Sequence, residues 1–266
     1  MEDINAKEYV YSLLLIEGSM SRIRFMNTEV DNFTMNEAIE AIDRLIQQDK
    51  NGYVVTPNID HIVRLETDEN LQRVYANADI ILTDGKPMIW MSKLYGTPIK
   101  EKVSGSDLFP RLCKLAAEKN YRVFLLGAAE GVAVKAASNL QKKFPGLMIA
   151  GTYSPPFGFE KDEEEIQHII QIVTAAKQHI LIVGLGCPKQ ENFIYNYRNE
   201  LKVPVSLGLG ASIDFEAGIL KRAPKWMADH GFEWLYRVAQ DPKRMAKRYF
   251  VDDVKIIRLF FKYRPK

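Results

Sequence analysis

Short apolar runs alternate with amphipathic segments along most of this 266-residue chain. The runs are expected to be strands, at Arg22–Glu29, Tyr53–Thr56, Ile80–Thr83, Arg122–Leu126, Leu147–Tyr153, Ile180–Val183 and Val205–Leu209. Between them, apolar residues recur at the three- and four-residue spacing of helices that bury one face. This β-α alternation predicts a Rossmann-like α/β fold, in which a mostly parallel sheet is flanked by helices.

Polar residues mark where several of the expected helices begin. Thr34 and Glu37 have the spacing of a capping box. Asn58 is expected to cap a short helix, and further helices are expected over Met88–Tyr95 and from Asp107 onward. Because ligands of open α/β sheets bind at the carboxyl ends of the strands, the residues that follow the strands are the candidate site.

The stretch from Gly184 to Glu191 is the most informative of these strand ends. Its sequence, Gly-Leu-Gly-Cys-Pro-Lys-Gln-Glu, follows a buried strand and leads into a helix, with Pro188 suited to the first helical turn. The glycines allow close backbone approach, and amides at a helix start can bind an anion such as a diphosphate. A tight turn without a ligand explains the segment equally well, so both interpretations stay open.

Three other strand ends carry polar residues, and each has two interpretations. Asp84 is either a general base in the crevice or a turn residue that bonds its own backbone. Thr56 and Asn58 either bind sugar and phosphate oxygens or serve to cap the next helix. The Val103–Asp107 stretch offers amides and hydroxyls to a ligand, or one of its last two residues caps a helix.

Residue patterns also limit the cofactors. The dinucleotide fingerprint fails, because Lys189 and Ile213 stand where the two glycine pairs would need a third glycine. The two cysteines form no disulfide framework or zinc spacing, and the four histidines form no pair four residues apart. The carboxylate pair Asp252-Asp253 lies in a basic tail rather than at a strand end. We therefore expect neither a cofactor nor a metal.

Charge is distributed unevenly along the chain. The whole chain has a formal net charge of +2, whereas residues 221–266 hold 13 Lys/Arg and five Asp/Glu, a net charge of +8. Such asymmetry points to nucleic acid, an anionic membrane surface or phosphorylated substrates. We divide the chain into an N-terminal extension (1–21), a Rossmann-like body (22–220) and a basic helical appendage (221–266).

The last helix of the appendage is expected to run from Asp241 to about Lys262 and to be amphipathic. Its basic stripe comprises Arg244, Arg248, Lys255, Arg258 and Lys262, and its apolar flank comprises Met245, Tyr249, Ile256 and Phe260, widened by Ile257 and Phe261. This pattern is typical of a helix at a membrane interface, although a helix packed on the body would show it as well. Since no run approaches the ~20 apolar residues of a spanning helix, we expect a soluble or peripheral protein.

Five of these stretches resemble, in the same order, motifs of the WecG/TagA/CpsF family of bacterial glycosyltransferases. They are Thr56–Asn58, Asp84–Gly85, Val103–Asp107, Gly184–Glu191 and Gly208–Asp214, and the resemblance runs from about Arg22 to the C-terminus. It implies an inverting enzyme that moves a hexose, such as N-acetylmannosamine, from a UDP donor to a polyprenyl-diphosphate-linked sugar in cell-wall or surface polysaccharide synthesis. It also implies a cytoplasmic enzyme, peripheral on the inner face of the cell membrane.

The resemblance assigns roles to individual positions. It makes Asp84 the base and places Thr56 beside the reacting centre. The substrate-binding positions that it implies are Asn58, Lys102, Gly105, Asp107, Gly127, Gly186, Lys189, Gln190, Glu191, Gly210, Asp214, Arg237, Arg244 and Lys247. The last three come from the appendage and are expected to hold the diphosphate. Lys102 stands where the family usually has arginine, which keeps the charge but loses the bidentate fork.

The expected partners are therefore the UDP-sugar donor, the lipid-linked acceptor and an anionic membrane surface, with no nucleic acid. Within the same family, a glucose or uronic acid donor is the alternative. From other classes, the rivals are a nucleic-acid-binding protein that uses the basic tail and a nicotinamide oxidoreductase. The acidic body disfavours nucleic acid binding. A homo-oligomer stays open.

Overall fold

The computed structural model describes residues 22–224, 226–227 and 230–264, so the predicted extension 1–21 lies outside the described residues. Its main sheet has six parallel strands, in the order β4 (Ile80–Ile81), β3 (Gly52–Val55), β8 (Val205–Gly208), β7 (Ile180–Gly184), β5 (Arg122–Gly127) and β6 (Met148–Tyr153). The inner strands are apolar and buried, as expected of a parallel sheet covered on both faces. The predicted α/β fold with a mostly parallel sheet is confirmed.

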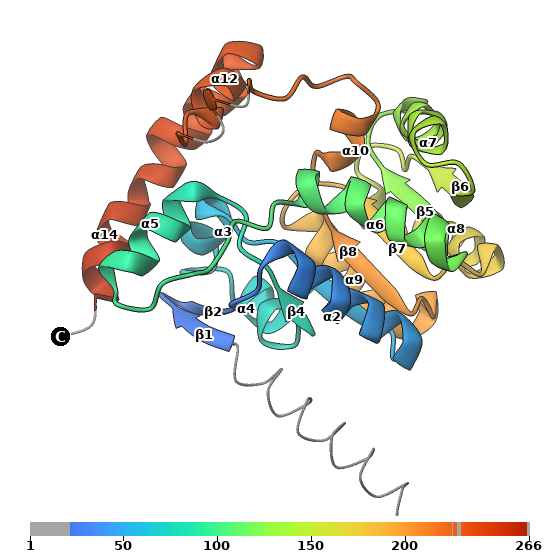
Figure 1. Ribbon diagram of the computed structural model, residues 1–266, viewed down its shortest axis with the longest axis horizontal. Helices are drawn as coiled ribbons and strands as arrows, with labels where there is room; N and C mark the ends of the chain where they lie inside the picture. The colour runs from blue at the N-terminus through green and yellow to red at the C-terminus, as the bar shows by residue number, and fades with distance from the viewer. Residues whose placement is uncertain (1–21, 225, 228–229, 265–266) are drawn as a thin grey trace, which may run out of the picture.

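Helices cover the sheet on both faces and produce two apolar cores (Figure 1). Along β3, Val54 contributes to one core while Tyr53 and Val55 contribute to the other, because successive strand residues point to opposite faces. One core includes residues of α2 (Met35–Gln48), α6 (Gly105–Lys119), α7 (Val132–Lys143) and α10 (Ser212–Glu216). The other includes residues of α3 (Ile59–Arg64), α4 (Glu69–Ala76), α5 (Lys86–Leu94), α8 (Glu163–Ala176) and α9 (Lys189–Leu201).

Local capping chemistry was predictable, whereas one strand was not. Thr34 and Glu37 form the capping box of α2, with bonds of 3.3 and 2.6 Å. The single strand predicted over Arg22–Glu29 is wrong, because the chain turns back there as the hairpin β1 (Arg22–Phe25) and β2 (Thr28–Asp31). Met26 adopts a left-handed φ of 52°, which allows the tight turn.

The strand order brings the residues after β3, β4 and β8 to one edge. β3 lies between β4 and β8, and the amide of Asp84, after β4, donates a 2.8 Å bond to the carbonyl of Pro57, after β3. Further along the edge, β5 approaches β7 closely at Gly127, where a Cβ would lie 2.4 Å from the carbonyl oxygen of Gly184. With a φ of +114° as well, this position requires glycine.

The C-terminal segment forms an arm that ends beside α5 (Figure 1). Its elements are α12 (Glu233–Gln240), α13 (Pro242–Lys247), the π-helical turn η2 (Arg248–Asp252), the short η3 (Asp253–Lys255) and α14 (Ile256–Lys262). The segment predicted as a helix from Asp241 to Lys262 is helical from Pro242 to Lys262, but its α-helical geometry gives way to π- and 3-10-helical turns between Arg248 and Lys255. Of the predicted apolar flank, Met245 and Ile256 are only 8% and 7% exposed and Phe260 packs against the core, whereas Ile257 and Phe261 are exposed. The division into domains at residue 221 stays a prediction.

Candidate active site

A polar cavity of about 430 Å³ lies at the carboxyl edge of the sheet, and we call it the first cavity. Residues that follow four different strands line it, among them Thr56, Asp84, Gly186 and Gly210. The parallel arrangement places these loops together although they are far apart in the sequence. The first cavity thus lies where the sequence predicted a site.

Asp84 is the carboxylate of the first cavity whose surroundings best suit proton transfer. Burial raises the pKa of Asp84 above its ordinary value, while the nearby cations Arg237 and Lys102 lower it. A carboxylate with a raised pKa is a stronger base than a solvated one, provided that it stays ionised at the working pH. Asp84 is therefore suited to accept a proton from a bound hydroxyl.

Thr56 is a buried neighbour on the adjacent strand end. Its hydroxyl donates a 3.2 Å hydrogen bond to the carbonyl of Gly208, and the residue is only 6% exposed. The bond ties the end of β3 to the end of β8 beneath the cavity. Thr56 lines the cavity, so its oxygen can contact a ligand there while it fixes the spacing of the two loops.

Gln190 and Glu191, at the start of α9, organise the floor of the first cavity. The Gln190 Oε1 accepts hydrogen bonds from the amides of Gly186 (3.2 Å) and Gly210 (3.1 Å), and its Nε2 donates a 2.8 Å bond to Glu191. A Cβ at Gly208 would lie 3.1 Å from that Nε2, so glycine leaves room for the Gln190 side chain. These two amides therefore bond within the protein, rather than being free to bind a diphosphate.

Two residues that the sequence analysis did not assign to the substrate site complete this part of it. His61 lies with its Nδ1 2.9 Å from the Oδ1 of Asn58 and its Nε2 3.4 Å from buried Glu191. Arg248, from η2, donates a 2.9 Å bond to the same Asn58 oxygen. Asn58 also caps α3 by accepting a 3.1 Å bond from the amide of Asp60, so the predicted cap is confirmed.

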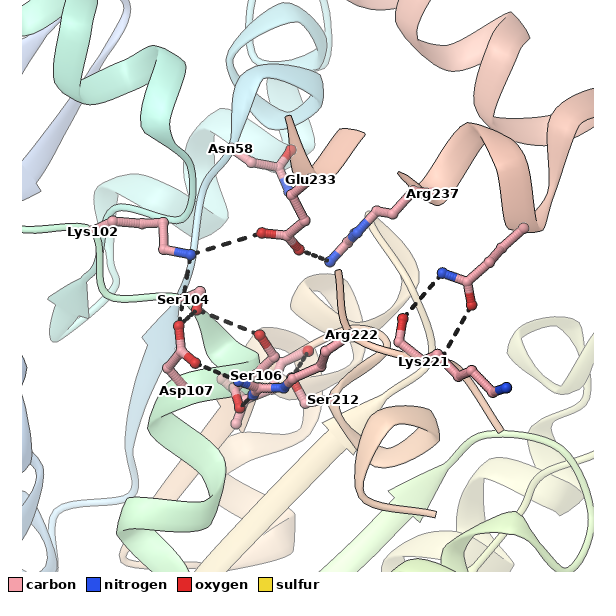
Figure 2. Close-up of polar contacts among 12 residues, drawn as sticks. Asn58, Lys102, Ser104, Ser106, Asp107, Ser212, Lys221, Arg222, Glu233 and Arg237 are labelled. Atoms are coloured by element: carbon pink, nitrogen blue, oxygen red, sulfur yellow. Dashed lines mark hydrogen bonds and ion pairs between the residues drawn. The ribbon is translucent and has the colours of Figure 1, made fainter. Parts of the chain in front are cut away.

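The first turn of α6 and the loop before it contact the C-terminal segment (Figure 2). Asp107 pairs with Arg222 at 2.6 Å and with Lys102 at 3.6 Å, and it accepts a 2.5 Å bond from Ser104. Ser104 occupies the N-cap position of α6, so the expectation of a cap at Ser106 or Asp107 is wrong. Polar residues of this stretch thus connect the body to the appendage.

A second cavity of about 430 Å³ adjoins the first. Its walls are largely apolar and come from α5 and the C-terminal arm, with Met91, Trp234, Phe250 and Ile257 among them. Four residues line both cavities, namely Asn58, Asp84, Arg237 and Arg248. Asp84 therefore stands at the junction of a polar cavity and an apolar one.

Comparison with known proteins shows the family to which this chain belongs. The profile described as Glycosyl transferase WecG/TagA/CpsF family matches residues 23–266. The chain belongs to this family. It is therefore a glycosyltransferase, and the resemblance noted in the sequence is confirmed.

Three relatives carry the name N-acetylglucosaminyldiphosphoundecaprenol N-acetyl-beta-D-mannosaminyltransferase. The protein of Bacillus spizizenii is 34% identical over 86% of this chain and 85% of its own length. The protein of Bacillus subtilis is 31% identical over 86% of each chain. The protein of Staphylococcus aureus (strain MW2) is 28% identical over 86% of this chain and 89% of its own length.

Several positions implied by the WecG/TagA/CpsF resemblance lie away from both cavities. Lys189 pairs with Glu160 at 2.5 Å, Gly127 packs against β7, and Asp214 is not among the lining residues. Gly105 allows α6 to start close to the loop after β8, where its Cβ would lie 3.2 Å from the carbonyl of Leu209. Glu191 is buried beneath the floor. Their roles in binding stay predictions.

The appendage supplies cations to the first cavity of this WecG/TagA/CpsF protein. Arg237, Lys247 and Arg248 line it, and Arg237 also stacks over Phe215 with its guanidinium 5.4 Å from the ring centroid. Arg244 belongs to α13, but its side chain lies outside the described residues. The appendage thus places cations at the cavity where the sequence predicted contact with the diphosphate.

Within the described residues, Asp60, His61 and Cys187 form one group that could hold a metal, with ligand atoms within 4.8 Å of one another. Two of the three already have protein partners, since Asp60 pairs with Arg64 at 3.0 Å and His61 contacts Asn58. Burial raises the pKa of the Cys187 thiol, which disfavours the thiolate that binds metals. That the enzyme needs no metal stays a prediction.

Proposed function

We propose that this glycosyltransferase moves N-acetylmannosamine from UDP-N-acetylmannosamine to an undecaprenyl-diphosphate-linked N-acetylglucosamine. The observation that carries the proposal is the position of Asp84 between a polar and an apolar cavity of similar volume. A reaction between a nucleotide sugar and a lipid-linked sugar needs two such sites that meet at one base. The relatives' names state both the lipid-linked acceptor and the mannosaminyl group.

The donor would occupy the first cavity. Its diphosphate carries negative charge, and Arg237, Lys247 and Arg248 line that cavity. Charge-assisted contacts from such side chains stabilise a diphosphate both when it is bound and when it leaves. Thr56 and Asn58 offer hydroxyl and amide groups to the sugar.

The acceptor would occupy the second cavity. The aromatic walls at Trp234 and Phe250 suit the first prenyl units, and Lys86 and Lys102 can pair with the acceptor's own diphosphate. The acceptor sugar would then extend towards Asp84, which both cavities share. This assignment explains why two cavities of contrasting polarity adjoin one another.

The transfer follows from that placement. Asp84 accepts the proton of the acceptor hydroxyl while the hydroxyl oxygen attacks the anomeric carbon of the donor sugar. The bond from that carbon to the UDP oxygen breaks on the opposite face, so the configuration inverts. UDP leaves with the bonding electron pair, and the cations of the appendage stabilise its developing charge.

Turnover with a panel of donors tests this proposal directly. UDP-N-acetylmannosamine, UDP-glucose and a UDP-uronic acid would each be mixed with a lipid-diphosphate-N-acetylglucosamine acceptor, and UDP release measured. We expect the fastest release with UDP-N-acetylmannosamine and none without acceptor. Faster release with another donor would replace the sugar, and no release with any donor would contradict the proposal. Steeply salt-dependent DNA or RNA binding would favour the rival nucleic-acid function.

We also propose that the enzyme works as a peripheral protein on the inner face of the cell membrane. None of the described helices has both the length and the apolar composition needed to cross a bilayer. Exposed apolar residues gather on two helices that lie side by side (Figure 1), Trp90 and Leu94 on α5 and Ile257 and Phe261 on α14. The hydroxyl of Tyr95 donates a 2.7 Å bond to the carbonyl of Phe260, which joins the two helices.

Substitutions at this surface test the membrane proposal without damage to the core. Leu94 and Phe261 are 69% and 65% exposed and line neither cavity. We expect the double variant Leu94→Ser/Phe261→Ser to lose binding to anionic vesicles by about 10-fold or more, with unchanged transfer to a water-soluble acceptor. Val134→Ser, at a 60% exposed position of α7, is the matched control. Unchanged vesicle sedimentation in the double variant would contradict this surface.

A further inference from the structure

Glu233, the first residue of α12, bridges two cations that come from distant parts of the chain. Its Oε2 lies 3.8 Å from the Nζ of Lys102, in the loop before α6. Its Oε1 accepts a 3.0 Å bond from the guanidinium of Arg237, one turn further along α12. Figure 2 shows the three side chains converging, with the Glu233 carboxylate between the two cations.

These three groups surround the junction of the two cavities. Glu233, Lys102, Arg237 and Asp84 all line the second cavity, and Arg237 and Asp84 also line the first. The side chains of Lys102, Arg237 and Glu233 are 18%, 31% and 33% exposed, so water screens their interactions less than it would on an open surface. A change of charge at Glu233 would therefore change the electrostatic environment of the Asp84 carboxylate.

We propose that Glu233 is a positioning residue of this active site, which holds Lys102 and Arg237 in place and balances their charge beside Asp84. The inference rests on the proposed function, because it assumes that Asp84 is the base of the transfer. It adds a residue to which neither the motifs nor the resemblance gave a role. It also explains why α12 begins at the active-site junction.

The charges around Asp84 determine the sign of the effect. Burial is the largest cause of the raised pKa of Asp84. Among the neighbouring charges, Arg237, Lys102 and His61 lower this pKa, and Glu233 raises it. The other ionisable groups that line the first cavity are Asp60, Arg64, Cys187, Asp241, Lys247, Arg248 and Asp252, and those that line the second are Lys86, Arg248, Tyr249 and Asp253. Removal of the Glu233 charge leaves the two cations uncompensated. The anionic form of Asp84 then becomes more stable, and its pKa falls.

The position of the Arg237 side chain depends on Glu233 more than the position of the Lys102 side chain does. Lys102 has a second carboxylate at 3.6 Å, in Asp107, which itself is fixed by Arg222 and Ser104. Arg237 has the 3.0 Å bond to Glu233 and the contact with the ring of Phe215. Loss of the carboxylate should therefore misplace mainly the guanidinium that is proposed to contact the diphosphate.

The test is the pH dependence of kcat/KM for UDP-N-acetylmannosamine with a short lipid-diphosphate-N-acetylglucosamine acceptor. We expect Glu233→Gln to lower kcat/KM by about 10-fold and to move the acid limb to lower pH by roughly half a unit. Glu233→Asp keeps the charge, so its limb should stay near that of the wild type. Lys102→Met removes one cation, so its limb should move to higher pH. Glu118→Gln, whose carboxylate pairs with Lys114 on the surface of α6, is the matched control and should change neither quantity.

The outcomes separate the possible roles. An acid limb that does not move in Glu233→Gln, whether or not the rate falls, would overturn the inference and leave Glu233 a structural residue. Equal losses in Glu233→Gln and Glu233→Asp would do the same. If Glu233→Gln fails to fold, a limb of Lys102→Met that stays in place overturns the inference. A wild-type enzyme that transfers no sugar at all contradicts the proposed function instead.

Discussion

The two cavities that meet at Asp84 are alike in volume and different in origin. Each encloses about 430 Å³. The first is built from loops that follow parallel strands and from the C-terminal segment that covers them, and its lining includes polar groups such as Thr56 and Gln190. The second is built from α5 and the C-terminal arm, and its lining includes Met91 and Trp234.

The difference shows how one enzyme can hold two unlike substrates. A nucleotide sugar is recognised by hydrogen bonds and charges in fixed positions, which strand-end loops of a rigid sheet supply. A prenyl chain offers only apolar surface, which helices can cover without exact geometry. Asp84 and Arg237 belong to both cavities, so the chemistry lies where the two modes of recognition meet.

The largest expected effect comes from the residue that the cavities share. Asp84→Asn keeps the shape but cannot accept a proton, so we expect turnover to fall by roughly 100-fold or more while UDP affinity changes only a few-fold. Steady-state kinetics and UDP titration measure the two quantities. Asp49→Asn is the matched control, because this exposed C-cap of α2 is left-handed and tolerates asparagine. Near-normal turnover of Asp84→Asn would remove Asp84 from the mechanism.

The origin of each cavity also explains how much the sequence could predict. Asp84, Thr56 and Gly186 each lie within three residues of the end of an apolar strand, so local pattern and strand-end geometry located them. The caps at Thr34 and Asn58 were predictable for the same reason, since their partners lie within three residues.

What the sequence could not predict depends on contacts between distant segments. Arg248 and Asn58 are 190 residues apart, and Lys102 meets Glu233 across about half of the chain. The same periodicity fits a helix on a membrane and a helix packed on the body, so it could not predict that Ile256 and Leu259 are buried while Phe261 is exposed. The second cavity is formed where such distant segments meet, and no sequence motif predicts it.

A substitution in the apolar cavity should affect the acceptor alone. Trp234 lines the second cavity, with its ring centroid 5.9 Å from that of Tyr249 and 6.0 Å from that of Phe250. We expect Trp234→Ala to raise KM for a long-chain acceptor by about 10-fold, because contact with the prenyl chain is lost, and to leave UDP affinity unchanged. Trp226→Ala, at a 61% exposed position away from both cavities, is the control. An equal loss of UDP affinity would mean that the cavities are not separate sites.

The reciprocal substitution in the polar cavity should have a smaller effect. Lys247 lines the first cavity from α13 and is exposed, so one charge-assisted contact with the diphosphate is at stake. We expect Lys247→Ala to weaken UDP binding by about 5-fold and to leave KM for the acceptor unchanged. Lys243→Ala, on the same helix but lining neither cavity, should leave both unchanged. Isothermal titration with UDP at two salt concentrations would show whether the contact is electrostatic.

The smallest expected effect is that of chelation, which tests whether cations of the protein suffice in the polar cavity. Arg237, Lys247 and Arg248 line the cavity that would hold the diphosphate, so the charge that a metal would stabilise already has partners. We expect turnover in excess EDTA to stay within about twofold of turnover with Mg²⁺ or Mn²⁺. The group formed by Asp60, His61 and Cys187 is the place where this expectation could fail. If EDTA abolished turnover and a divalent ion restored it, Cys187→Ser and Asp60→Asn would show whether that group holds the ion. Retained activity in EDTA would instead assign the stabilisation of leaving UDP to the appendage, and with it the reason why that arm reaches the carboxyl edge of the sheet.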